Sequence, residues 1–173
     1  MAITRIGGAT AITGTIPQGN IANASLGAVT ALPGAIATGK VLQVSNFVQA
    51  SSQQTFSSTS YADLTNVTVN ITPSSTSNKI LIVANIGSDT NNNEGYGMQF
   101  VRGSTSIYAT KQTYTLYTDG VTQIYNVNMF NYYDSPNSTS QQTYKVQIRS
   151  YDSASMNINT SYNSNIQVME IAG

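Results

Sequence analysis

The sequence predicts an all-β protein, an antiparallel β-sandwich of the jelly-roll type preceded by an extended N-terminal arm. Its 173 residues include 22 Thr and 11 Tyr, which fit a pleated surface, and few Lys or Glu. The chain is 40% hydrophobic, which is too apolar for a disordered polar tail. Short alternating segments separated by turn residues recur along it, and no segment has a helical period.

Composition divides the chain into an arm, residues 1–38, and a sandwich domain, residues 39–173. The arm holds one charge, Arg5, together with six Gly, two Pro and no aromatic residue. Its aliphatic residues follow no steady period, so neither a coiled coil nor an amphipathic helix is expected. We expect an extended arm that buries its aliphatics against other chains, the alternative being a floppy extension. The residues expected to anchor it are Ile3, Ile6, Ile12, Ile16, Ile21 and Leu26.

Five strands are expected in the first part of the sandwich. The first covers residues 40–49. In the second, Val67, Val69 and Ile71 alternate with polar residues until Pro73 breaks the strand. The third, residues 79–86, is a continuous apolar run, as expected for a central strand covered on both faces. The fourth alternates Tyr96, Met98 and Phe100, and a turn at residues 102–104 leads to a short strand near Ile107.

The last third contains the clearest turn signal. Asp119-Gly120 lies between Tyr117-Thr118 and Val121-Thr122 and predicts a two-residue hairpin, because a type I′ turn needs positive φ at both central positions. That turn would place Tyr114 opposite Tyr125 as a cross-strand aromatic pair.

Alternation predicts the remaining strands. Tyr125, Val127 and Met129 mark one face of a long strand that ends at the turn residues 134–137. Three more strands follow, of which the last runs from Ile166 to Ile171. The first two of these carry Tyr144, Val146 and Ile148, and Met156 and Ile158.

The residue inventory excludes most familiar chemistry. There is no His and no Cys, so an ordinary zinc site, a thiolate nucleophile and an imidazole base are absent. Seven basic and seven acidic residues give no basic footprint for nucleic acid or a membrane surface. Residues 89–95 resemble a calcium loop, but Glu94 stands where Gly is needed and Phe100 where a bidentate Glu is needed. We therefore expect no enzyme, no cofactor and no metal.

Tyrosine is the residue best suited to a binding surface here. Ten of the 11 Tyr fall between Tyr96 and Tyr162, and such rings suit stacking on sugars or docking of protein partners. The alternative for most of them is packing at the ends of the sandwich or between chains. Polar neighbours mark four as candidates for surface binding: Tyr114, Tyr117, Tyr132 and Tyr133.

Several stretches in order resemble small tail-fibre-like and virion appendage proteins of tailed bacteriophages, particularly marine ones. The matching stretches are GKVLQV (39–44), ITPSSTSNKIL (71–81), YDSP (133–136), QTYKVQIR (142–149) and VMEIAG (168–173). TGTIP (13–17) also resembles the leaders of such fibres. The resemblance implies a virion structural protein, usually trimeric, without catalytic residues. Only 38 residues precede the domain, which favours a short fibre or a capsid-bound appendage over a full-length tail fibre.

The expected function is therefore that of a phage virion protein assembled in the host cytoplasm. Residues 1–38 would anchor it to other virion proteins, and the sandwich would form a homotrimer exposed for attachment to the host surface, with host surface glycans as candidate ligands. Two alternatives stay open, a capsid decoration or head-fibre protein without a receptor role and a free carbohydrate-binding module. Neither nucleic acid nor membrane insertion is expected.

Overall fold

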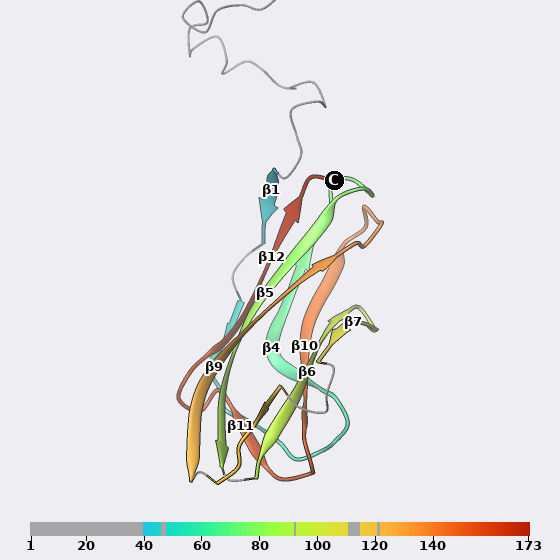
Figure 1. Ribbon diagram of the computed structural model, residues 1–173. Helices are drawn as coiled ribbons and strands as arrows, with labels where there is room; N and C mark the ends of the chain where they lie inside the picture. The colour runs from blue at the N-terminus through green and yellow to red at the C-terminus, as the bar shows by residue number, and fades with distance from the viewer. Residues whose placement is uncertain (1–39, 46–47, 92, 111–114, 121) are drawn as a thin grey trace, which may run out of the picture. The chain divides into compact units, whose positions relative to one another are not determined.

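The computed structural model describes residues 40–45, 48–91, 93–110, 115–120 and 122–173, which form two facing β-sheets (Figure 1). Every pairing between strands is antiparallel, and no helix occurs in these ranges. The all-β sandwich predicted from the sequence is confirmed.

The larger sheet has seven strands and the smaller sheet has five. The larger sheet consists of β1 (Val41–Val44), β2 (Val48–Ala50), β3 (Gln54–Phe56), β5 (Lys79–Asn91), β9 (Gln123–Asp134), β11 (Met156–Ile158) and β12 (Ser164–Ile171). The smaller sheet consists of β4 (Ala62–Ile71), β6 (Gly95–Arg102), β7 (Thr105–Ala109), β8 (Leu116–Tyr117) and β10 (Gln142–Ser150). The extended conformation expected for residues 1–38 lies outside the described residues.

Strand β5 is the centre of the larger sheet. Its 13 residues pair with β12 and then β11 along one edge, and with β9 along the other. Strand β1 in turn pairs with the far edge of β12, so β1, β12, β5 and β9 lie side by side (Figure 1). Strand β9 is therefore an edge strand of this sheet.

Alternate side chains of both sheets fill the space between them. The alternations predicted for β6 and β10 are confirmed, because Tyr96, Met98 and Phe100, like Tyr144, Val146 and Ile148, point inward and are buried. Burying one large aliphatic side chain stabilises a fold by about 1.5–3 kcal/mol. The inward side chains that β5, β6 and β10 bury are Ile80, Ile82, Ala84, Ile86, Tyr96, Met98, Phe100, Tyr144, Val146 and Ile148.

The strand expected at residues 79–86 is central, as predicted, but it is not covered on both faces. Ile80, Ile82 and Ile86 point into the sandwich and are buried. Leu81 and Val83 point to the outer face of the larger sheet and are only half-buried. An apolar run indicates that a strand is well enclosed, and among the described residues the outer side chains of this strand are enclosed by the neighbouring strands.

One further boundary differs from the prediction, and one predicted turn is confirmed. The strand expected over residues 40–49 is divided into β1 and β2, which both pair with β12. The turn at residues 102–104 is confirmed, because it joins β6 to β7 with Arg102 opposite Thr105. Gly103 has a φ of 59°, a conformation that glycine adopts without steric cost.

The hairpin predicted at Asp119-Gly120 is wrong. Gly120 has the expected positive φ, but the two flanking strands do not pair with each other. Tyr117 in β8 lies opposite Gly95 of β6, and Tyr125 in β9 lies opposite Asp89 of β5. The chain therefore crosses between the two sheets at this turn, because each flanking strand completes the ladder of a different sheet.

A matched pair of substitutions in β5 should separate its two faces. Ile82→Ala should lower the free energy of unfolding by about 2–5 kcal/mol, because it leaves a cavity between the sheets. Leu81→Ala removes as many carbon atoms from a half-buried outward position and should cost clearly less. Urea denaturation followed by circular dichroism measures both values. Equal losses would contradict the assignment of the two faces.

Candidate interaction surface

Strand β9 carries a stripe of exposed apolar and aromatic side chains, which we call the β9 stripe. It consists of Tyr125, Val127, Met129 and Tyr133, of which Met129 is 69% exposed. Asn131 completes this outward-facing row. These are residues of the strand face noted in the sequence, and the structure turns that face outward.

The opposite face of β9 is partly polar although it points into the sandwich. Asn126 and Asn128 lie there, and the Asn128 Nδ2 donates a 2.8 Å hydrogen bond to the Tyr96 hydroxyl. Tyr96 is fully buried, and burial raises its pKa to about 12, although the hydrogen bond from Asn128 acts in the opposite direction. The first half of β9 thus directs amides inward and apolar side chains outward, the reverse of an ordinary surface strand.

The apolar outer surface continues from β9 across the larger sheet. Tyr133 lies opposite Leu81 of β5, and Leu81 lies opposite Met169 of β12. Met169 in turn lies opposite the exposed Val44 of β1. Because residues in direct register point to the same face, these four side chains form an apolar row across four strands.

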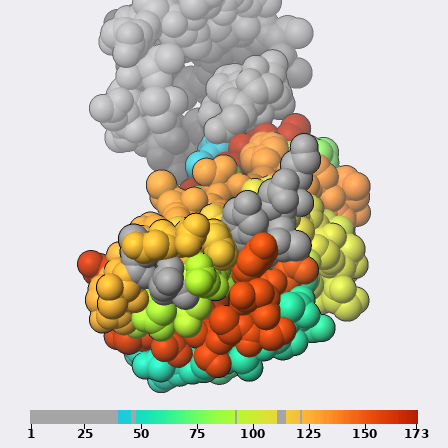
Figure 2. All heavy atoms as spheres, turned by 60° about the horizontal axis from the view of Figure 1, so that its bottom comes forward, coloured from blue at the N-terminus to red at the C-terminus, as the bar shows by residue number. Residues whose placement is uncertain are grey.

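The outer face is covered at one place farther along β5. A Cβ atom on Gly87 would collide with the backbone carbonyl of Tyr162, so the turn before β12 lies directly on this glycine. Figure 2 looks onto the end of the sandwich at which β5 ends and β6 begins. There the connection between β10 and β11 (red-orange) and the start of β9 (orange) lie on either side of the β5 and β6 residues (green).

The four tyrosines expected to form a binding surface do not form one platform. Tyr114 lies outside the described residues, as do the anchoring candidates of the arm. Tyr133 is exposed on β9, whereas Tyr132 points to the other side of that strand, is half-buried, and has its ring 5.3 Å from that of Tyr108. Tyr117 is exposed on β8 of the smaller sheet, where its ring meets the edge of the Tyr151 ring.

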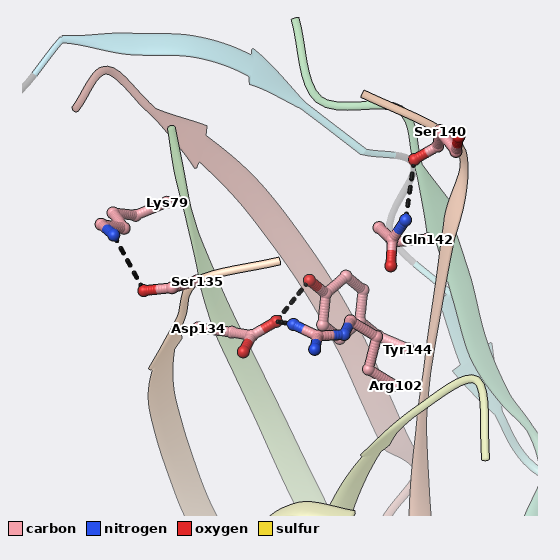
Figure 3. A network of polar contacts seen from close by, with 7 residues as sticks. All are labelled: Lys79, Arg102, Asp134, Ser135, Ser140, Gln142 and Tyr144. Atoms are coloured by element: carbon pink, nitrogen blue, oxygen red, sulfur yellow. Dashed lines mark hydrogen bonds and ion pairs between the residues drawn. The ribbon is translucent and has the colours of Figure 1, made fainter. Parts of the chain in front are cut away.

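A buried carboxylate fixes the C-terminal end of β9. The Asp134 Oδ2 accepts a hydrogen bond from the Tyr144 hydroxyl at 2.7 Å and lies 2.6 Å from the Arg102 Nη1 (Figure 3). Burial, followed by the hydrogen bond to Asp134, raises the pKa of Tyr144. The network ties β6, β9 and β10 together. Lys79 and Ser135 add a 2.9 Å hydrogen bond beside it.

A second buried carboxylate, Glu170, holds β1 against the rest of the sandwich. Its Oε1 accepts hydrogen bonds from the Asn78 Nδ2 at 2.6 Å and from the Ser74 backbone and hydroxyl at 2.6 and 2.9 Å. Its Oε2 accepts one from the Gln43 Nε2 at 2.6 Å. Burial alone would raise the pKa of Glu170, but these hydrogen bonds outweigh it and lower the pKa.

The acidic side chains among residues 89–95 accept hydrogen bonds from donors of the protein itself. Asp89 accepts a 2.8 Å hydrogen bond from the Gln123 Nε2, and Glu94 accepts a 2.7 Å bond from the backbone of Asn91. Within the described part of the chain, no three acidic, His or Cys residues gather as a metal site would require. The described residues also contain no helix that is long and apolar enough to cross a membrane.

Comparison with known proteins shows the fold. No family model and no curated protein matches the chain. The crystal structure of the infectious bursal disease virus VP2 subviral particle is similar, with a TM-score of 0.51 and 14% identity over 78% of this chain and 34% of that one. The structure of the Gx strain of that virus matches with a TM-score of 0.43 and 12% identity, over 75% of this chain and 37% of that one. This chain thus spans about a third of the VP2 chain, and the similarity is one of fold, a β-sandwich like that of a virus-particle protein.

Replacing the buried carboxylate with an amide should change stability in a pH-dependent way. Glu170→Gln turns one acceptor oxygen into a donor that faces another donor, and should cost about 1.5–3 kcal/mol at neutral pH. The lowered pKa of Glu170 in the fold means that its stabilisation is present above the ordinary value of 4.5 and is lost as the pH falls through the folded-state pKa. The difference between wild type and variant should therefore shrink in acid.

Urea midpoints at neutral pH and at about pH 3 measure this effect. Asp63→Asn is the control, because the Lys145 hydrogen bond also lowers the pKa of Asp63 but its side chain is 53% exposed. That change should cost less than about 1 kcal/mol. A Glu170→Gln variant as stable as wild type at neutral pH would contradict the role given to Glu170.

Proposed function

We propose that this chain is a structural protein of a virus particle, a short fibre or tail-fibre-like appendage that exposes its β-sandwich to the host surface. The observation that carries the proposal is the fold. A sandwich of this kind occurs in the VP2 subviral particle. The sequence resemblance to phage appendage proteins, which covers most of residues 39–173, points to the same class.

The composition of the chain supports a structural role over a chemical one. In the described residues the Asp134 Oδ2 and both carboxylate oxygens of Glu170 accept hydrogen bonds from protein donors that join neighbouring strands and loops. Exposed aromatic and aliphatic side chains on β8 and β9 are instead suited to contact with other macromolecules.

Anchoring is the part of the proposal that falls to residues 1–38. Each Ile or Leu that a partner buries would contribute about 1.5–3 kcal/mol before ordering costs. The homotrimer expected from the sequence belongs to the same proposal, and its mass can be measured by light scattering on the full chain. Capsid decoration without receptor binding is the nearest alternative, and it shares the anchoring step.

Incorporation into particles tests the proposed function. The full chain should be found by blotting in gradient-purified virions of the virus that encodes it. Changing Ile12, Ile16 and Ile21 together to Ser should release the protein, because the arm then loses the apolar contacts that anchor it. The Leu42→Ser variant, altered on β1, is the control and should incorporate as wild type does. Absence of the chain from particles would overturn the function, and normal incorporation of the triple variant would overturn the arm as anchor.

Receptor binding can be tested separately on Tyr117, the exposed aromatic residue on β8. If the sandwich attaches to host glycans through the surface around Tyr117, Tyr117→Ala should lower glycan-array binding about tenfold, as expected for loss of a ring-stacking contact. Tyr162→Ala, which removes another exposed ring, is the matched control. An array without any signal for the wild-type chain would favour capsid decoration, whereas binding by a monomer that is absent from particles would favour a free carbohydrate-binding module.

A further inference from the structure

The free edge of β9 is long and regular. The strand pairs with β5 in unbroken register from Ile124 opposite Thr90 to Asp134 opposite Ile80. No strand in the described part of the chain pairs with its other edge. That edge presents backbone N–H and C=O groups over 12 residues.

Natural sheets protect exposed edges with charges, prolines, bulges or short strands, and β9 has none of these. Its sole charged residue is Asp134, which is buried against Arg102. The other edges are protected. Strand β3 has three residues, the β1 and β7 ladders contain register shifts, and β4 has a register shift and carries Asp63. The unprotected edge of β9 is therefore a specific feature of this strand.

The orientation of β9 gives a second, independent indication of a contact. Four residues of its outward row, Tyr125, Val127, Met129 and Tyr133, are apolar or aromatic, while Asn126 and Asn128 point inward. This arrangement is costly for a free surface strand, because it exposes apolar area and places amides inside the sandwich. It is favourable if another molecule covers the outward row.

The order of residues along the β9 stripe indicates what that molecule is. Read outward from Met129, the row has Val127 and Asn131 on either side and then a tyrosine at each end, Tyr125 and Tyr133. An antiparallel pairing of two identical strands about Met129 would place Tyr125 opposite the partner subunit's Tyr133, and Met129 opposite the partner subunit's Met129. Aromatic cross-strand pairs stabilise such ladders, and no like charges would meet.

We infer that β9 is the contact between two copies of this chain, which pair edge to edge about a two-fold axis at Met129. The contact continues the larger sheet from one protomer into its partner and brings the two β9 stripes side by side, so that opposed side chains bury part of each other's apolar area. A two-fold contact joins copies in pairs, whether the pair is two single chains or two trimers. The inference rests on the geometry of β9 and stands apart from the proposed function.

The mass of the full chain in solution tests the inference. Wild type should contain an even number of copies by light scattering and sedimentation velocity. The double variant Val127→Lys with Met129→Lys should have half that mass, because it places four like charges at the two-fold axis. Both side chains are exposed, so the fold should persist, as circular dichroism would show. Leu42→Lys is the control, since this residue is exposed on the far edge strand β1 and should leave the mass unchanged.

Cross-linking tests the register. The chain has no cysteine, so one introduced thiol reports on one position. Met129→Cys should form an intermolecular disulfide under mild oxidation, because residues paired across a ladder lie within disulfide reach. Leu42→Cys should not form one.

Three results would overturn the inference. They are a wild-type chain that is monomeric or has an odd number of copies, a double variant with unchanged mass, and a Met129→Cys chain that links no better than Leu42→Cys. Loss of particle incorporation by the double variant with no change in mass would assign β9 to a different virion protein. Absence of the chain from virions would overturn the proposed function and leave the inference standing.

Discussion

The hydrogen-bonded ladders along β5 are the interaction on which the rest of the structure depends. This strand pairs with β12 and β11 on one edge and with β9 on the other, so the larger sheet is joined through it. Its inward residues Ile80, Ile82 and Ile86 also form the middle of the core. Backbone pairing and apolar burial therefore coincide in one strand, and buried peptide groups are satisfied where the packing is densest.

Only 8% of the residues are charged, and two of the carboxylates, Asp134 and Glu170, are buried in the sandwich. Asp134 and Glu170 lie near the same end of β5, opposite one another in the ladders on its two edges at Ile80. Asp134 is balanced by Arg102 and a tyrosine hydroxyl, whereas Glu170 receives only uncharged donors in the described structure. A buried carboxylate whose oxygens are satisfied specifies partners, because few other arrangements of the chain supply as many donors.

The sequence predicted a strand and its buried face correctly where apolar residues on one face alternate with polar residues on the other. In β10, Tyr144, Val146 and Ile148 alternate with polar or charged residues, so burial of the apolar face was the sole favourable choice. In β9, alternation shows which residues share a face but not which face meets the core. The register with β5 decides that, and it turns Tyr125, Val127 and Met129 outward. A strand's partner is a long-range property that local spacing does not contain.

The same limit explains the hairpin and the binding surface. Asp119-Gly120 predicts a tight turn from local backbone preference, but the long edge of β5 offers β9 a ladder over its full length, which a short hairpin cannot match. Tyr132 and Tyr133 have equally polar surroundings in the sequence, yet adjacent strand residues face opposite ways, so Tyr133 is exposed and Tyr132 packs beside Tyr108. The exposed row on β9 could have been found from the sequence only by knowing its partner strand.

The position of Glu170 has a mechanical consequence. Any tension that reaches the sandwich from residues before β1 is applied first at Lys40, whose carbonyl accepts a hydrogen bond from the Ala172 backbone, and then at Val41, at one end of the β1–β12 ladder. Gln43, two residues farther along, is hydrogen-bonded to both Glu170 and the Thr72 carbonyl, so its side chain joins β1 to two other parts of the sandwich. The backbone ladder and these side-chain hydrogen bonds would both have to break before β1 could separate from β12. The chain has no cysteine and so no disulfide to resist such a force. The buried carboxylate of Glu170 therefore helps to hold β1 in place when the residues before it are pulled.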